Sequence, residues 1–346
     1  MPAALTPAFF DRLVAWQRQS GRHGLPWQGT RDPYRVWLSE IMLQQTQVTT
    51  VRDYYPRFLA RFPDVRALAQ APQDEVLALW TGLGYYSRAR HLHRCAQVVV
   101  ADWGGVFPTR AEQLQTLPGI GPSTAAAIAA FCHGERISIL DGNVRRVLTR
   151  LLAFADDLSQ PAAERRLWAQ AQALLPAQPD ADAMVAYTQG LMDLGATVCR
   201  RTDPTCSACP VAPLCQAHAL GSETAFPVKS RRVLRRTEAW WLLWWRRADG
   251  AYWVQRRPER GIWAGLYAPP VLAEPPPTRP GTVLHPVLRH ALTHRDLLLH
   301  AVEQPWSEAG PVSADAPGCW VDSQAQLVGL GLPVPVRNWL AEHLPA

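Results

Sequence analysis

The sequence predicts a mainly α-helical N-terminal domain followed by a smaller α+β domain. From about residue 8 to residue 220, apolar residues recur at spacings of three and four, and proline or glycine separates the segments. After the basic segment KSRRVLRR this spacing stops. EAWWLLWW and AYWVQRR, joined by a turn at 248–250, have the pattern of two strands of a hairpin. We therefore expect a helical domain at 1–222, a basic linker at 223–236 and an α+β domain at 237–346.

The individual elements follow from the same patterns. The apolar spacing predicts helices near 8–19, 33–46, 48–61, 73–80, 86–101, 123–133, 142–153, 161–175 and 181–195. In the second domain it predicts a strand at 297–304 and a closing helix at 334–344, and the proline-rich stretch 274–280 predicts a loop.

Composition limits the classes of function. Apolar residues make up 48% of the 346 residues, enough for two globular cores. Lys and Arg number 35 against 29 Asp and Glu, so the net charge of +6 favours polyanionic partners such as nucleic acid. No stretch approaches the ~20 apolar residues of a membrane span, and the N-terminus has no signal-peptide pattern. We expect a cytoplasmic, nucleoid-associated protein with no membrane partner.

Four cysteines lie close together in the chain. Cys199, Cys206, Cys209 and Cys215 have the spacing C-x6-C-x2-C-x5-C, and in a reducing compartment such a group indicates a metal centre rather than disulfides. Structural zinc sites more often show two separate C-x2-C pairs, whereas only one occurs here. The spacing therefore favours one [4Fe-4S] cluster and leaves zinc as the alternative.

The segment LPGIGPSTAAAI, at 117–128, has the pattern of a phosphate-binding turn. Gly119 and Gly121 flank one apolar residue and precede a helix start. Glycines allow backbone dihedrals that turn several amide groups toward one anion, and the helix N-terminus adds to this. By itself such a turn is equally compatible with ordinary loop structure.

Two carboxylates occupy settings that suit cleavage of an N-glycosidic bond, which needs a proton for the leaving base and a negative charge beside the sugar cation. Glu40, in VWLSEIMLQQTQV, is flanked by apolar residues that would raise its pKa. Asp141, in ISILDGNVRRVL, stands at a predicted helix start that would keep it ionised. The alternatives are a surface glutamate and a plain helix cap.

Several segments together resemble the MutY family of adenine DNA glycosylases, in the endonuclease III superfamily. They are LPWQ, YRVWLSEIMLQQTQV, LWTGLGYYSRAR, LPGIGPSTA and ILDGNVRRVL, and the similarity extends over nearly all of residues 8–220. The resemblance implies a helix-hairpin-helix fold, a structural [4Fe-4S] cluster and excision of adenine mispaired with 8-oxoguanine or guanine in double-stranded DNA. It implies that Glu40 protonates adenine at N7 and that Asp141 stabilises the sugar cation. We expect the protein to be a monomer.

The resemblance also implies how DNA is bound. The expected contacts to the flipped adenine and to the opened base stack are Leu25, Trp27, Gln28, Asn143, Gln45, Tyr85 and Leu83. Ser123 stands where endonuclease III has the lysine that forms a Schiff base, so the resemblance implies a monofunctional enzyme.

The C-terminal part resembles the Nudix-like domain with which MutY proteins recognise 8-oxoguanine. The segment QRRPERGIWAGLYAPP is similar to its entry, but the R-E-x-x-E-E helix that holds magnesium in Nudix hydrolases is missing. In ALTHRD, the residues Leu292, Thr293 and His294 take the places of the family's F-S-H motif, and Thr293 keeps a hydroxyl for the lesion base.

Two other functions are compatible with parts of this pattern. One is a glycosylase with lyase activity like that of endonuclease III, against which Ser123 and Glu40 both count. The other is a non-catalytic DNA-binding protein whose cluster senses redox state, against which the paired motifs of Glu40 and Asp141 count.

Overall fold

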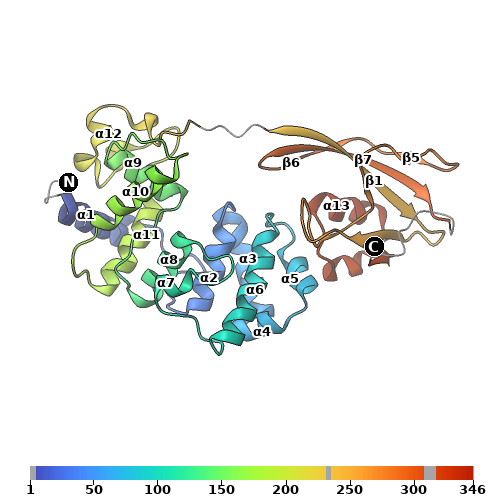
Figure 1. Ribbon diagram of the computed structural model, residues 1–346, viewed down its shortest axis with the longest axis horizontal. Helices are drawn as coiled ribbons and strands as arrows, with labels where there is room; N and C mark the ends of the chain where they lie inside the picture. The colour runs from blue at the N-terminus through green and yellow to red at the C-terminus, as the bar shows by residue number, and fades with distance from the viewer. Residues whose placement is uncertain (1–4, 231–234, 308–316, 346) are drawn as a thin grey trace. The chain divides into compact units, whose positions relative to one another are not determined.

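The computed structural model describes residues 5–230, 235–307 and 317–345 (Figure 1). The chain divides into two compact units, of which the first comprises residues 1–66 and 94–232 and the second comprises residues 67–93 and 233–346. Arg231 and Arg232 of the expected basic linker lie outside the described residues. Within the described parts of the chain, no helix is both long and apolar enough to cross a membrane.

The first unit is helical, as the sequence predicted. Its longer helices are α1 (Leu5–Ser20), α2 (Pro33–Leu43), α3 (Val48–Arg61), α8 (Pro122–His133), α9 (Gly142–Leu151), α10 (Pro161–Ala173) and α11 (Ala181–Thr197). The short elements are α7 (Ala111–Leu114), α12 (Gln216–Ala219) and the 3-10 turns η1 (Cys206–Ala208), η2 (Ala212–Leu214) and η3 (Glu223–Ala225). Helix α6 (Ser87–Asp102) crosses the boundary between the units.

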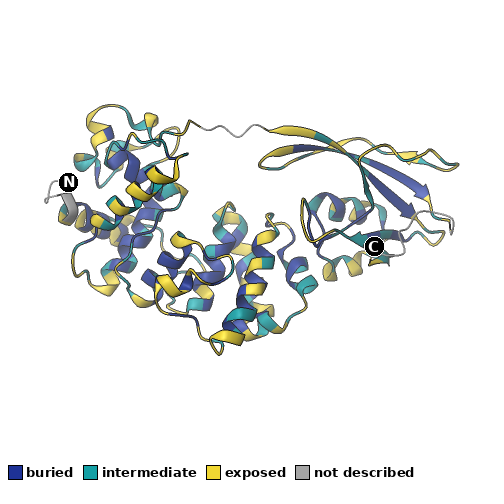
Figure 2. Ribbon diagram, viewed as in Figure 1, coloured by how far each residue is buried: buried dark blue, intermediate teal, exposed yellow. Residues whose placement is uncertain are grey.

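The core of the first unit joins segments that are distant in sequence. Leu13 of α1, Leu148 of α9, Leu167 of α10 and Leu191 of α11 are fully buried in one cluster, which Figure 2 shows as dark blue inner faces. Helices α9 and α11 pack especially closely at Gly195, where a Cβ atom would come within 2.7 Å of the Cβ of Asn143. A glycine is therefore required in α11 beside the start of α9.

The second unit contains a mixed sheet and several helices. Its strands are β1 (Arg236–Arg246), β2 (Tyr252–Arg256), β3 (Tyr267–Ala268), β4 (Val271–Leu272), β5 (Val283–Leu284), β6 (Leu288–Ala291), β7 (Arg295–Pro305) and β8 (Gly318–Val321). The main strand order is β3-β2-β1-β7-β5, with β4 beside β1, β6 beside β7 and β8 beside β2. The helical elements are α4 (Val65–Gln70), α5 (Gln73–Trp80), the start of α6, η4 (Gln324–Gly329) and α13 (Val334–His343).

The centre of the sheet is the parallel pair β1 and β7, which runs in register from Arg236 opposite Arg295 to Arg246 opposite Pro305. Helix α13 packs on it through aromatic rings, because Trp339 stacks on the buried Trp244 at a centroid distance of 3.8 Å. The hairpin β1–β2, the strand at 297–304 and the closing helix near 334–344 were all predicted from the sequence, and the structure confirms them.

Residues 67–93 pack with the C-terminal part of the chain. The Tyr86 hydroxyl donates to the Leu332 carbonyl at 2.9 Å, the Arg90 guanidinium donates to the Ala264 carbonyl at 2.7 Å, and Arg256 pairs with Asp74. The contiguous domains expected from the sequence therefore differ from the compact units in this segment. Apolar spacing predicts that a segment is helical, but it does not reveal which partner its buried face contacts.

Candidate active site

A cleft of about 1390 Å³ in the first unit gathers most of the residues singled out in the N-terminal sequence. Those that line it are Leu25, Trp27, Gln28, Glu40, Gln45, Ser123, Asp141 and Asn143. They come from the loop before α2, from α2 and its C-terminal end, and from the N-termini of α8 and α9. The cleft thus unites motifs that are separated by more than a hundred residues of sequence.

Glu40 lies on α2, a helix that the sequence starts with a strong signal. Asp32 caps it by accepting from the Tyr34 amide at 2.9 Å, and Pro33 occupies the first turn. Most of the helix is buried, so that the half-buried Glu40 faces the cleft from an apolar wall. Burial, followed by the negative charge of Asp141, raises the pKa of Glu40 to about 8. The carboxyl is therefore protonated at neutral pH.

Asp141 caps α9 directly after the buried residues Ile139 and Leu140. Its side chain accepts from the Val144 amide at 2.7 Å. Burial raises its pKa, against the lowering effect of the helix amides and of Arg145 and Arg146. The helix start acts in the direction expected from the sequence, and burial opposes it. The surroundings of Asp141 thus include groups that favour its charged form, whereas burial and the charge of Asp141 both raise the pKa of Glu40.

The loop that carries Leu25, Trp27 and Gln28 is held by its own hydrogen bonds. The Gln28 side chain accepts from the Leu25 amide and donates to the Arg22 carbonyl, both at 3.0 Å. Trp27 is 8% exposed and packs edge-on against Tyr55. Part of its surface still lines the cleft, so Trp27 can both pack in the core and contact a ligand.

Sequence reasoning missed the anchor of this loop. Asp193, on α11, is completely buried and accepts from the Arg22 amide at 2.9 Å, from Arg22 Nε at 2.7 Å and from Gln189 Nε2 at 2.8 Å. Gln189 and Arg22 also line the cleft. An acidic residue within the apolar helix AMVAYTQGLMDLG was the available signal, since buried carboxylates need partners.

Two polar side chains at the helix N-termini have structural partners as well. Ser123 Oγ accepts from the Leu140 amide at 3.1 Å, which ties the start of α8 to the strand-like segment before α9. Asn143 Oδ1 accepts from Arg146 Nη2 at 2.8 Å. Neither position carries an amine, so among these two residues there is no group that could form a Schiff base.

The turn between α7 and α8 contains the two glycines of the expected phosphate-binding pattern. Gly119 adopts a φ of +76°, as the sequence predicted, whereas Gly121 is extended and caps α8. The space beside Gly121 is open, with no atom within 4 Å of an added Cβ. The surface beside Gly121 is therefore open.

Two exposed polar residues at loop positions have strained backbones. Gln45 has a φ of +57° and Tyr85 a φ of +47°, values that residues other than glycine seldom adopt. Gln45 follows α2 in the first unit, and Tyr85 precedes α6 in the second unit. Leu83, which we expected to contact DNA with Tyr85, is only 4% exposed and belongs to the packing of its loop. In this conformation the structure offers Tyr85, rather than Leu83, to a ligand.

Thr293 and His294 lie at the exposed tip of the β6–β7 hairpin. The turn is closed by the Leu292 amide, which donates to the Arg295 carbonyl at 2.7 Å. The Thr293 hydroxyl lies 2.6 Å from the Tyr85 hydroxyl, and both residues belong to the second unit. Two residues selected separately from the sequence are thus joined by a hydrogen bond.

The four clustered cysteines line one cavity together with Arg150. The buried Arg150 guanidinium donates to Cys199 Sγ at 3.3 Å, and its own backbone carbonyl lies 3.4 Å from Cys215 Sγ. Among the described residues, no three of the cysteine sulfurs lie mutually within 4.8 Å. One zinc ion would hold its sulfurs within about 4 Å of each other, because each Zn–S bond is about 2.3 Å long. The thiol donors therefore fit a larger, polynuclear group better than a single ion.

Comparisons with known proteins agree with this arrangement. Residues 38–172 match the HhH-GPD superfamily of base excision DNA repair proteins, and residues 240–342 match the NUDIX domain. An adenine DNA glycosylase of Buchnera aphidicola subsp. Baizongia pistaciae is 35% identical over 267 residues, covering 77% of this chain and 74% of the relative. The adenine DNA glycosylase of Homo sapiens is 45% identical over 220 residues, covering 61% of this chain and 39% of the human protein.

Solved structures show the same fold. A thermostable thymine-DNA glycosylase superposes with a TM-score of 0.55 at 26% identity, covering 63% of this chain and 98% of that protein. Endonuclease III in a non-covalent complex with DNA superposes with a TM-score of 0.51 at 18% identity, covering 62% of this chain and 95% of that protein.

Proposed function

We propose that the protein hydrolyses the N-glycosidic bond of adenine mispaired with 8-oxoguanine or guanine. The chain belongs to the adenine DNA glycosylase family, within the HhH-GPD superfamily, and is a base excision repair glycosylase. The observation that carries the proposal is the pair of unlike carboxyls in one cleft. Burial raises the pKa of Glu40 to about 8, which favours its acid form at neutral pH, whereas helix amides, Arg145 and Arg146 favour the charged form of Asp141. Such a pair can serve as acid and as counter-charge.

In the proposed reaction the adenine leaves the base stack and enters the cleft beside Leu25, Trp27, Gln28 and Asn143. Glu40 donates its proton to N7 of the adenine, which makes the base a better leaving group. The electron pair of the glycosidic bond departs with the base, and the cation that forms on the sugar is stabilised by the negative charge of Asp141.

Water completes the reaction in this proposal. Its oxygen forms the new bond to C1′, and the proton that it releases returns to the Glu40 carboxylate, so that the products are adenine and an intact strand with an abasic site. Ser123 has a hydroxyl that accepts a hydrogen bond from Leu140, and no lysine stands at this position. The enzyme is therefore monofunctional in our proposal.

DNA would be held at several points. The positive φ of Gly119 and the open surface beside Gly121 suit a turn that binds a phosphate. The exposed side chains of Gln45 and Tyr85 suit filling the space that the flipped base leaves. Thr293 supplies a hydroxyl for the base opposite the adenine, and its neighbour His294 is also exposed. In this proposal the NUDIX-like domain recognises the lesion without hydrolysing nucleotides, since the described residues 257–284 contain no helix.

We propose that Cys199, Cys206, Cys209 and Cys215 hold one [4Fe-4S] cluster. When bound, such a cluster stiffens the loop that carries its ligands, and here it plays no part in proton transfer. Arg150 supports the loop by donating to Cys199 Sγ at 3.3 Å and to the Arg200 carbonyl at 2.7 Å. Brown protein with about four irons for each chain is the expected result, and colourless protein with one zinc would contradict it.

One assay tests the proposed activity. The purified protein is incubated with a duplex that has adenine opposite 8-oxoguanine, and the strands are separated with and without alkali. Excision by a monofunctional enzyme yields a cut strand only after alkali. Cutting without alkali would indicate lyase activity, and DNA binding without any excision would indicate a non-catalytic protein.

We also propose that the protein acts as a monomer. Because its proposed substrate is DNA, we propose that it acts on the nucleoid in the cytoplasm.

A further inference from the structure

We propose that Arg235 and Asp296 are positioning residues for the turn that carries Thr293, and that they help to set the preference for 8-oxoguanine over guanine. The proposal rests on the proposed function, in which Thr293 contacts the base opposite the adenine. Arg235 belongs to the predicted basic linker, and Asp296 lies at the start of β7. Their contacts connect the end of the linker with the β6–β7 hairpin.

The turn of the β6–β7 hairpin lacks the residues that such turns favour. Thr293 and His294 connect Leu292 with Arg295, whose backbone groups close the hairpin. Two-residue hairpin turns favour glycine or asparagine, because these residues accept the positive φ that matches the twist of the strands. In the described structure neither Thr293 nor His294 has a positive φ. The favoured local geometry therefore does not fix the shape of this turn.

The end of the linker contacts the turn on both sides of Thr293. Arg235 Nη2 donates to the Leu292 carbonyl at 3.0 Å, just before the turn. The backbone amide of Arg236 donates to the His294 carbonyl at 3.2 Å. Thr293 lies between these two contacts in the chain and is exposed. The position of its hydroxyl therefore depends on where the end of the linker is held.

Asp296 fixes the side chain of Arg235. One carboxylate oxygen of Asp296 accepts from Arg235 Nη2 at 2.7 Å, and the other lies 3.3 Å from Arg289 Nη2. The Asp296 side chain is 10% exposed, and a carboxylate so far removed from water needs cationic partners. One guanidinium nitrogen of Arg235 thus contacts both Asp296 and the Leu292 carbonyl, which ties the turn to the start of β7.

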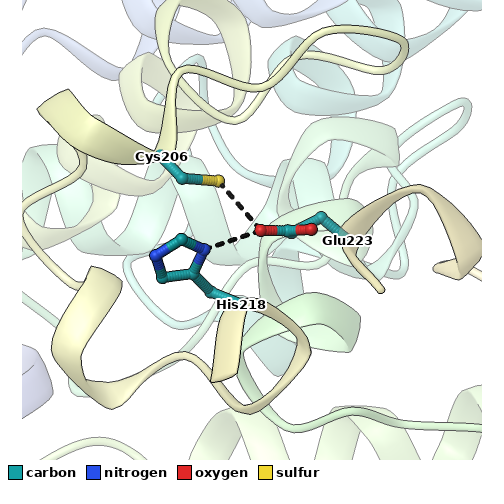
Figure 3. A group of neighbouring side chains, drawn as sticks. All are labelled: Cys206, His218 and Glu223. Atoms are coloured by element: carbon teal, nitrogen blue, oxygen red, sulfur yellow. Dashed lines mark hydrogen bonds and ion pairs between the residues drawn. The ribbon is translucent and has the colours of Figure 1, made fainter. Parts of the chain in front are cut away.

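A polar cluster of the first unit shows how this pair differs from local contacts. Glu223 Oε1 lies 3.4 Å from Cys206 Sγ and 2.7 Å from His218 Nδ1, and all three residues belong to one short stretch of the chain (Figure 3). Arg235 and Asp296 lie 61 positions apart, so their ion pair fixes one segment against another. Loss of the pair should shift the turn, while the pairing of β1 with β7 holds the strands.

Excision rates on two mispairs test the proposal. Arg235→Met removes the guanidinium, so the preference for 8-oxoguanine over guanine opposite adenine should fall about fivefold, the effect of one lost hydrogen bond. Asp296→Asn keeps the shape of the side chain but loses the charge that holds Arg235, and it should lower the preference in the same direction. The preference is a ratio of two rates, so a variant that only reduces the amount of folded enzyme leaves it unchanged. A preference equal to that of the wild type in both variants would overturn the proposal.

A double variant distinguishes positioning from an independent contact with DNA. If Arg235 acts through Thr293, Arg235→Met combined with Thr293→Ala should lower the preference no further than Thr293→Ala alone. Independent contributions would multiply to a loss of about 25-fold, and that result would contradict a positioning role.

The matched control is Arg295→Gln, which removes an arginine from the same hairpin. The Arg295 guanidinium pairs with Glu238, and its side chain is 47% exposed. This variant should keep the preference, although the loss of a positive charge weakens binding of both duplexes alike. If Arg295→Gln lowered the preference as much as Arg235→Met, the preference would depend on net charge rather than on the position of the turn, and the proposal would be wrong.

The proposed function and the positioning roles can fail separately. If the wild type excises no adenine, the proposed function is wrong, and the ratio of the dissociation constants for the two duplexes replaces the ratio of rates. If the wild type excises adenine and Thr293→Ala lowers its preference while Arg235→Met does not, only the positioning roles of Arg235 and Asp296 are wrong.

Discussion

The cleft of the first unit and the tip of the β6–β7 hairpin in the second unit are built on opposite principles. In the cleft, Glu40 and Asp141 stand on buried helices, and burial has changed the pKa of both. At the tip, Thr293 and Tyr85 are exposed and are held by one hydrogen bond between their hydroxyls. Chemistry depends on a fixed and partly dehydrated environment, whereas recognition of a large ligand requires groups that the ligand can reach.

The largest effect should come from the cleft. Glu40→Gln keeps the shape of the side chain but cannot donate a carboxyl proton, so we expect the excision rate to fall by about 10²- to 10⁴-fold. Binding of the mispaired duplex should change little. Single-turnover kinetics and a gel-shift assay measure the two effects. The matched control is Glu342→Gln, which alters an exposed glutamate of α13 and should leave both unchanged. Unaltered excision by Glu40→Gln would remove Glu40 from the mechanism.

The pH profile should distinguish the two carboxyls of the cleft. Because the acid form of Glu40 is the active one, excision should be retained at pH 7 and decline about tenfold for each pH unit above about 8, the pKa of Glu40. Asp141 must be ionised, and burial raises its pKa, so the acid limb should begin above the ordinary range of an aspartate. Single-turnover rates across the pH range measure both limbs. A profile that stays flat from neutral to strongly alkaline pH would contradict the proposed acid.

Local sequence patterns singled out the two carboxyls of the cleft, whereas resemblance to the MutY family supplied its other residues. The cap at Asp32, the proline after it and the apolar positions of α2 fix the helix that presents Glu40. The same holds for Asp141, which is at once the cap of α9 and a cleft residue. Asp193 was missed because its role depends on Arg22, which lies 171 positions away in the sequence. Spacing along one helix contains no information about such a partner.

The C-terminal half was less predictable for the same reason. The strands β1 and β7 were expected, but their parallel pairing joins segments that are about sixty residues apart and have no turn between them to signal it. The packing of residues 67–93 with the second unit depends on long-range contacts such as Tyr86 to Leu332. The Thr293–Tyr85 hydrogen bond also depends on this packing, so it could not be predicted from either motif alone.

A smaller effect is expected at the hairpin tip. Thr293→Ala removes a hydroxyl that we assign to the base opposite the adenine, and one hydrogen bond contributes about 1 kcal/mol, so the preference for 8-oxoguanine over guanine should fall about fivefold. Thr293→Ser, which keeps the hydroxyl, should behave like the wild type. Excision rates on the two mispairs measure the preference.

Tyr85→Phe sharpens this result, because it removes the partner hydroxyl in the 2.6 Å contact but keeps the aromatic ring. If the Thr293 hydroxyl contacts the base without help from Tyr85, Tyr85→Phe should preserve the preference for 8-oxoguanine. If the hydrogen bond positions Thr293, the preference should fall as it does in Thr293→Ala. An unchanged preference in Thr293→Ala itself would place lesion recognition elsewhere.

The remaining effect concerns the stability of the protein, not its activity. The folded protein raises the pKa of Glu40 from 4.5 to about 8, so between these values the folded state binds more protons than the unfolded state. Its free energy of unfolding therefore decreases as the pH rises through this window.

Glu40→Gln removes the group that titrates. We expect the variant to be more stable than the wild type by about 2 kcal/mol above pH 8, which corresponds to a few degrees in Tm. The difference should vanish below pH 4.5, where Glu40 is neutral in both the folded and the unfolded state, and thermal melts below pH 4.5 and above pH 8 measure it. Thr293 has no group that titrates in this range, and Thr293→Ala should show no such dependence on pH. If Glu40→Gln were no more stable than the wild type at high pH, the raised pKa, and with it the contrast between a desolvated cleft and an exposed tip, would be contradicted.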